Sequence, residues 1–218
     1  TAPLRSVGSL VNRATEKLRA AQPRRGGEER EKGDPGVLPP PPDLDRTPWC
    51  LLNFGRPEEA VVWLERTAAG YSTVDDALGA ARAAVLLTQV HLEGRRVTAA
   101  GGWQQRASRL LEGCGPCREQ SQFEWITGRM ALASGDLDSA YVHAERAHEL
   151  ARALEDLDLE AVALIYWGHV CVARGEVRRG LELMDGAAAA VLGGVVAPWF
   201  AGLVDCGLVY LCQNRGGW

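Results

Sequence analysis

Two cysteines, Cys114 and Cys117, are separated by two residues in the run Cys114-Gly115-Pro116-Cys117. This spacing is short enough for a reversible disulfide, so the pair is a candidate for redox chemistry. A reactive cysteine of this kind sits at a helix N-terminus, which lowers the pKa of its thiol. Here residues 107–112 complete a helical pattern just before the motif, and the glycine and proline are typical of a turn. We interpret the motif as a loop between two helices and keep a thiol oxidoreductase as one alternative.

The other cysteines and the histidines show no spacing that suits a metal ion. Four cysteines stand within helical patterns and are interpreted as small buried apolar residues: Cys50, Cys171, Cys206 and Cys212. His143 and His148 are five residues apart, so they do not share a helix face as an i, i+4 pair would. The sequence also contains none of the phosphate-binding, dinucleotide-binding or serine-nucleophile motifs. We expect no enzyme activity, no metal ion and no cofactor.

Composition and charge exclude several kinds of partner. The 218 residues are 46% hydrophobic and 24% charged, with a formal net charge of −4. After residue 48 the chain carries fifteen Lys and Arg against twenty-one Asp and Glu, so no basic face for nucleic acid is expected there. No apolar run reaches the roughly 18 residues that a membrane-spanning helix needs. Six cysteines without a disulfide framework favour a reducing, cytoplasmic location.

A series of glycines gives the strongest structural signal. Five of them are spaced by 39, 41, 40 and 41 residues, and we call them the marker glycines: Gly55, Gly94, Gly135, Gly175 and Gly216. Each follows a helical pattern, and all but the last precede another. Glycine is favoured where a helix ends in the left-handed conformation. The series therefore predicts an all-α chain of helical hairpins, a solenoid with repeats of about 40 residues.

The chain divides at about residue 48. Residues 1–48 are rich in proline, glycine and charge and include four consecutive prolines at 39–42, so we predict a disordered tail. Residues 49–218 form the predicted helical-repeat domain. Its first helices are expected near 49–54, 75–93, 119–133, 157–174 and 198–214. Its second helices are expected near 57–69, 97–112, 137–153 and 177–192.

Small residues recur at fixed distances from the marker glycines. Five residues after a marker stand Ala60, Ala99, Ala140 and Gly180. Seven residues before a marker stand Gly128 and Gly168, and twelve after it stand Ala147 and Ala187. Small residues at such places let antiparallel helices approach closely. This pattern resembles the tetratricopeptide repeat, with Gly135-Asp136-Leu137 as its turn, although the period is about 40 residues and not 34.

A narrower resemblance covers residues 75–218. The runs Gly180–Asp185, Pro198-Trp199 and Cys206–Gly216, together with Gly102–Ala107 and Leu110–Gly113, resemble the tetratricopeptide-type region of large actinobacterial LuxR-type transcriptional regulators. The resemblance implies a sensor or scaffold segment whose DNA-binding helix-turn-helix lies in another part of the protein. We accordingly expect the sequence to be a fragment that stops partway through a repeat at Trp218.

The resemblance to the tetratricopeptide repeat places candidate binding residues on the first helices. In tetratricopeptide arrays these helices line the concave face, which implies a groove containing Trp125, Arg129, His169, Tyr210 and Gln213. A protein, a peptide or a small-molecule effector would bind there. The alternative is that Trp125 and Tyr210 only pack between neighbouring repeats. A free-standing peptide-binding adaptor of tetratricopeptide type is the second candidate function beside the regulator.

Overall fold

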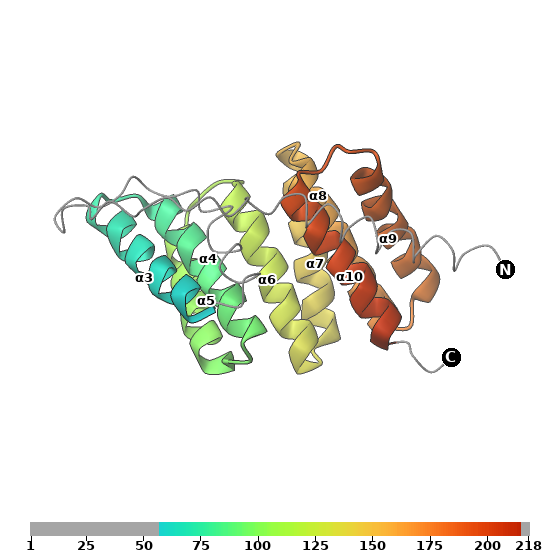
Figure 1. Ribbon diagram of the computed structural model, residues 1–218, viewed down its shortest axis with the longest axis horizontal. Coiled ribbons are helices and arrows are strands. Elements are labelled where there is room, and N and C mark those ends of the chain that lie inside the picture. The colour runs from blue at the N-terminus through green and yellow to red at the C-terminus, as the bar shows by residue number, and fades with distance from the viewer. Residues whose placement is uncertain (1–56, 215–218) are drawn as a thin grey trace, which may run out of the picture. The chain divides into compact units, whose positions relative to one another are not determined.

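The computed structural model describes residues 57–214, with side chains described as far as Tyr210. These residues form eight α-helices and no strand (Figure 1). In chain order the helices are α3 (Pro57–Thr73), α4 (Ala77–Glu93), α5 (Val97–Leu111), α6 (Arg118–Ser134), α7 (Leu137–Ala153), α8 (Leu157–Ala173), α9 (Val177–Leu192) and α10 (Pro198–Asn214). The all-helical prediction is therefore confirmed for this part of the chain.

The described helices belong to one compact unit, Pro41–Trp218. A second unit, Thr1–Pro40, lies entirely outside the described residues. So do the predicted tail of residues 1–48, the predicted helix at 49–54, Cys50, and the two end markers Gly55 and Gly216.

Short turns join consecutive helices, and every turn contains one residue with left-handed backbone. These residues are Asp75, Arg95, Gly113, Gly135, Glu155, Gly175 and Gly194. Gly135 and Gly175 adopt φ values of 83° and 88°, as the marker series predicts, because glycine has no Cβ to clash there. In both turns the amide of the residue after the glycine donates to a carbonyl five residues back: Asp136 N to Ala131 O at 3.0 Å, and Glu176 N to Cys171 O at 2.8 Å.

The prediction is wrong at Gly94. Its φ is −75°, and the left-handed conformation falls on Arg95 with φ 56°. Arg96 N accordingly donates to His91 O at 2.8 Å, the bond that Asp136 makes in its own turn. The reference position of the α4–α5 hairpin therefore lies one residue later than the glycine series indicates.

This shift restores the pattern of small residues. Counted from Arg95, the positions five and twelve residues later are Ala100 and Ala107, and both are fully buried. Ala99, which the glycine series selects, is only half-buried. The corresponding alanines of the next hairpin, Ala140 and Ala147, are buried as well. The small residues thus mark helix contacts, as the sequence predicts.

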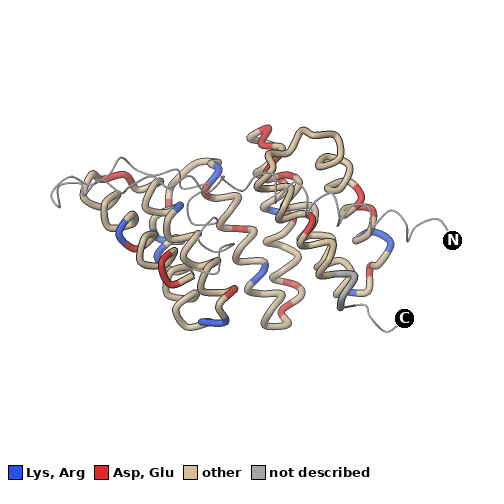
Figure 2. The backbone as a smooth tube through the Cα atoms, in the orientation of Figure 1, with Lys and Arg blue, Asp and Glu red and all other residues tan. Residues whose placement is uncertain are grey.

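Aspartates cap several helices directly after the left-handed residue. Asp76, Asp136 and Asp156 each accept a hydrogen bond from the amide three residues on, at 2.8 to 3.0 Å. These bonds satisfy amides that lack a partner in the first turn of a helix. Such caps place charge at the ends of helices, and Figure 2 shows acidic residues gathered at the tip between α7 and α8.

The helices α8 and α9 pack closely enough to bring their backbones into contact. A Cβ on Gly168 would lie 2.7 Å from the carbonyl oxygen of Gly180, and one on Gly180 would lie 2.6 Å from that of Gly168. The largest core cluster runs from α6 to α10 and includes Ile165, Met184 and Val204. Trp125 of α6 belongs to this cluster, and Tyr166 of α8 packs against it.

Candidate binding site on the first helices

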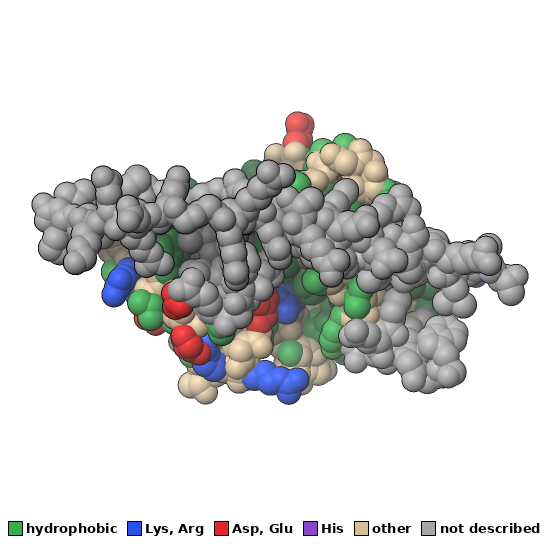
Figure 3. Space-filling model, viewed as in Figure 1, with side chains coloured by type: hydrophobic (Ala, Val, Ile, Leu, Met, Phe, Trp, Pro, Cys, Tyr) green, Lys and Arg blue, Asp and Glu red, His purple; other side chains and the backbone are tan. Residues whose placement is uncertain are grey.

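Four helices form a contiguous row. The first helices α4, α6, α8 and α10 contact one another in that order, and the second helices α5, α7 and α9 pack beside them. Side chains on equivalent turns of the first helices are therefore neighbours. In Figure 3 the visible part of one face mixes hydrophobic and charged side chains, so charge alone does not mark a site.

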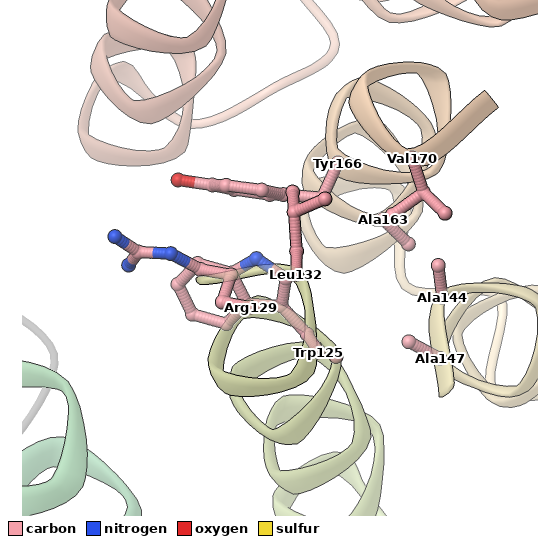
Figure 4. A pocket seen from close by; sticks show the side chains of 9 residues that line it. Trp125, Arg129, Leu132, Ala144, Ala147, Ala163, Tyr166 and Val170 are labelled. Carbon is pink, nitrogen blue, oxygen red and sulfur yellow. The ribbon is translucent and has the colours of Figure 1, made fainter. Parts of the chain in front are cut away.

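Arg129 packs against two aromatic rings that also contact each other. Its guanidinium carbon is 5.8 Å from the ring centre of Trp125 on α6 and 5.2 Å from that of Tyr166 on α8. The two ring centres are themselves 5.2 Å apart. Figure 4 shows the guanidinium group and the Tyr166 hydroxyl group pointing out on the same side. A cation held over π faces is stabilised by the ring quadrupoles and keeps a fixed orientation.

Helix α4 contributes a carboxylate to this arrangement. Oε1 of Glu93 lies 3.6 Å from a terminal nitrogen of Arg129 and accepts a hydrogen bond from Nε2 of Gln89 at 3.0 Å. Gln89 is only 1% exposed, so the Glu93 carboxylate is hydrogen-bonded to a buried amide group. Arg129 thus connects α4, α6 and α8.

His169 extends the row to α10. Its Nε2 lies 2.9 Å from the carbonyl oxygen of Gly207. Because a carbonyl oxygen only accepts, Nε2 carries the hydrogen, and the neutral ring has a lone pair on Nδ1. Burial lowers the pKa of His169, and the charge of Arg129 acts in the same direction. The His169 ring also contacts Tyr166 and Tyr210, with ring centres 5.6 and 5.8 Å away.

A narrow crevice opens beside Arg129. It lies between α6, α7 and α8 and is lined by Trp125, Gly128, Arg129, Leu132, Ala144, Ala147, Ala163, Tyr166 and Val170 (Figure 4). Its free volume is about 10 Å³, which is the size of a single water-sized group. The indole nitrogen of Trp125 is buried and has no hydrogen-bond partner among the described residues.

No model of a known protein family matches the chain, and no curated protein matches it either. Among the described residues no three His, Cys, Asp or Glu side chains come together as metal ligands. Within residues 57–214, no helix has the length and apolar character needed to cross a membrane.

The structure brings together four of the five predicted groove residues. Trp125 and His169 are buried, Arg129 is half-buried, and Tyr210 is 61% exposed. Gln213 lies in α10, but its side chain is outside the described part. Burial of Trp125 agrees with the packing alternative, whereas Tyr210 stands open to solvent.

Sequence reasoning missed Gln89, Glu93 and Tyr166. Arg129 and His169 each stand six residues before a marker glycine, and the same count from Gly94 selects Thr88. Counted from Arg95, which has the left-handed conformation, it selects Gln89. Gln89 was missed because the left-handed conformation of Arg95 cannot be recognised from the sequence, since arginine does not favour such a turn as glycine does. Tyr166 stands nine residues before Gly175, a position at which the repeat pattern predicts no groove residue.

The cysteine pair lies in the loop between α5 and α6. Cys117 is the N-cap residue of α6, and the Sγ of Cys114 lies 3.8 Å from the carbonyl oxygen of Leu110. Both thiols are free. Burial raises the pKa of Cys117 despite hydrogen bonds from backbone amides at the start of the helix. Since the thiolate is the reactive form, this environment disfavours redox chemistry.

A second arginine cluster lies on α7, α8 and α9. Arg179 stands over the rings of Tyr141 and Trp167 at 5.4 and 5.1 Å, and Arg174 stands over Tyr141 at 4.9 Å. Arg174 forms an ion pair with Glu176 at 3.2 Å, and Arg179 forms one with the same residue at 3.6 Å. Arg174 also pairs with a carboxylate of α7. These contacts connect consecutive helices, and none of these residues lines the crevice.

Proposed function

We propose that the helical part of the chain is a tetratricopeptide-like array of α-hairpins, with a repeat of about 40 residues, that binds a protein or a small-molecule effector without catalysing a reaction. The left-handed turns at residues 95, 135 and 175 support this repeat, as does the order of contacts along the first helices. The backbone contact between Gly168 and Gly180 supports the hairpin packing.

One observation carries the binding function. Arg129 packs against the rings of Trp125 and Tyr166. The Glu93 carboxylate of α4 lies 3.6 Å from Arg129, and the charge of Arg129 acts on the His169 imidazole of α8. Tryptophan, tyrosine and arginine packed together are characteristic of the residues that dominate binding energy at interfaces. Packing alone does not require a guanidinium group at this place, because an aliphatic side chain would fill the same space.

We further propose that this array is the sensor or scaffold segment of a cytoplasmic LuxR-type transcriptional regulator. The support is the resemblance of residues 75–218 to such regions. The array would bind an effector or a partner protein and pass this state to a DNA-binding helix-turn-helix located elsewhere in the protein. A peptide-binding adaptor would use the same face but would need no DNA-binding element.

The test uses the full-length protein. The coding sequence beyond Trp218 is read for a LuxR-type helix-turn-helix, and transcription from a target promoter is then compared between wild type and Arg129→Gln. We expect the variant to change transcription at least fivefold while its affinity for promoter DNA stays the same. Arg109→Gln, an exposed arginine of the second helix α5, is the matched control and should behave as wild type.

Two results would overturn the proposal. Absence of a helix-turn-helix from the remaining coding sequence would remove the regulator and leave the adaptor. If the Arg129 and Arg109 variants gave the same level of transcription, the packing of Arg129 against Trp125 and Tyr166 would be only structural.

A further inference from the structure

The indole nitrogen of Trp125 is a hydrogen-bond donor without an acceptor among the described residues. Trp125 is 7% exposed, so bulk water does not satisfy this N–H group. Buried polar groups are nearly always hydrogen-bonded, and an exception in a native structure calls for a reason. Figure 4 shows the nitrogen-bearing edge of the indole turned towards Tyr166, at the wall of the crevice.

A second donor with spare capacity stands beside the crevice. A guanidinium group has five N–H donors in a planar fork. The ion pair of Arg129 with Glu93 spans 3.6 Å, which exceeds the roughly 2.7 to 2.9 Å of a charged hydrogen bond. The unpaired indole N–H group of Trp125 and the incompletely paired guanidinium group of Arg129 therefore both belong to residues that line the crevice.

The crevice itself is small and apolar. Its other walls include Leu132, Ala144, Ala163 and Val170. A trapped water needs two to four polar partners, and these walls give it few besides the Trp125 nitrogen. One oxygen atom of an anion fits the free volume of about 10 Å³ and brings its own second oxygen to the mouth.

We propose that the crevice between α6 and α8 binds a carboxylate group, with one oxygen accepting from Nε1 of Trp125 and the other paired with Arg129. This assignment rests on the proposed function of the first helices as a binding surface, and it names the chemistry of the ligand. Glu93 lies beside Arg129 and repels a second negative charge, so a singly charged carboxylate fits better than a phosphate dianion. The body of the ligand stays outside the crevice, on the side to which the Tyr166 hydroxyl group points.

The carboxylate has two sources. It belongs either to a small organic acid or to an acidic side chain of a partner peptide. Acetate and a fluorescein-labelled peptide of six glutamates represent these two sources in the test.

The readout is the indole N–H signal of Trp125 in ¹H–¹⁵N spectra of the ¹⁵N-labelled chain, assigned by its loss in Trp125→Phe. Sodium acetate is titrated against sodium chloride at equal ionic strength. We expect a saturable shift of the Trp125 signal. Trp167 is the internal control, because its indole nitrogen is also buried without a described partner but does not line the crevice. Its signal should not move.

Two variants of Arg129 separate binding from folding. Arg129→Gln should weaken acetate binding at least tenfold, and Arg129→Lys should weaken it less, since lysine keeps the charge but loses the planar fork. Unchanged signals from the other tryptophans in both variants will show that the helices remain folded. Peptide binding that acetate displaces assigns the carboxylate to a partner, and acetate binding without peptide binding assigns it to a small acid.

The proposal is overturned if neither acetate nor the peptide shifts the Trp125 signal saturably. It is also overturned if Trp167 shifts equally, or if Arg129→Gln binds as well as wild type. Should these results occur while Arg129→Gln still alters transcription in the full-length protein, the proposed function stands and only the carboxylate assignment fails.

Discussion

His169 on α8 and Gly207 on α10 are joined by a hydrogen bond of 2.9 Å from imidazole Nε2 to the backbone carbonyl. The same contact leaves no room for a side chain on α10, because a Cβ on Gly207 would lie 2.7 Å from Cγ1 of Ile165. A buried imidazole and a glycine therefore fix the distance between two neighbouring first helices.

Stability should fall when the pH drops below the unfolded histidine pKa of about 6.5. Burial lowers the pKa of His91, His148 and His169 in the folded chain. Below about pH 6.5 the unfolded chain binds these protons while the folded chain does not, so protonation favours unfolding until the folded pKa values are reached. Urea unfolding at about pH 7.5 and 5.5 measures this loss.

The variant His169→Gln isolates one contribution to that pH dependence. A glutamine amide donates to Gly207 but does not titrate in this range. We expect the variant to lose less stability than wild type between the two pH values. An equal loss in both proteins would exclude His169 as a source of the effect.

Gly168→Ala should destabilise the chain by about 1–3 kcal/mol, the usual cost of overpacking a core. The new Cβ would lie 2.6 Å from Cγ of Met184 and 2.7 Å from the Gly180 carbonyl oxygen, and the backbone atom cannot move aside. Urea unfolding gives the difference. Gly102→Ala in α5 is the matched control, because its Cβ would meet nothing within 4 Å. It should stabilise the chain by about 0.5–1 kcal/mol through helix propensity, and a loss in the control equal to that in Gly168→Ala would contradict the packing explanation.

The sequence predicts the helices well because hydrophobic period, aspartate caps and turn glycines agree. The first helices expected at 119–133 and 157–174 are found at Arg118–Ser134 and Leu157–Ala173. Glycine at 135 and 175 reports a left-handed turn because no other residue adopts that conformation as easily. Helix boundaries can be predicted where several local signals agree.

The site was only partly predictable because its geometry depends on contacts between hairpins. Arg129 and Trp125 are four residues apart on one helix, so their contact follows from local spacing. The approach of Tyr166 and Glu93 depends on how α8 and α4 pack on α6, which no local pattern encodes. Cys206 shows the same limit. Its helical pattern favours a buried residue, yet it is exposed, whereas Cys171 is buried as expected.

The two described helix cysteines should differ in reactivity towards iodoacetamide. Cys206 is exposed and should be alkylated at least tenfold faster than the buried Cys171. Burial raises the pKa of the Cys171 thiol. Partial desolvation raises the pKa of Cys206 although the residue is exposed, and the charges of Asp205 and Glu93 act in the same direction. Alkylation of both should therefore accelerate as the pH rises towards 9 and beyond. Mass spectrometry of tryptic peptides measures each rate.

The variant Cys114→Ser should leave any insulin-reducing activity of the chain unchanged. A specific loss of that activity in the variant would restore the interpretation of Cys114 and Cys117 as a redox pair.

Arg95→Gly tests the corrected turn directly. Arginine in a left-handed conformation costs about 1–2 kcal/mol, which glycine removes, while the added freedom of glycine in the unfolded chain offsets about 0.5–1 kcal/mol. We expect unchanged or slightly higher stability by urea unfolding. Gly135→Ala is the reciprocal change at the equivalent turn and should cost about 1–2 kcal/mol, because its φ of 83° is strained for any residue with a Cβ. A large loss in Arg95→Gly would mean that the arginine side chain, and not the backbone, stabilises the α4–α5 turn.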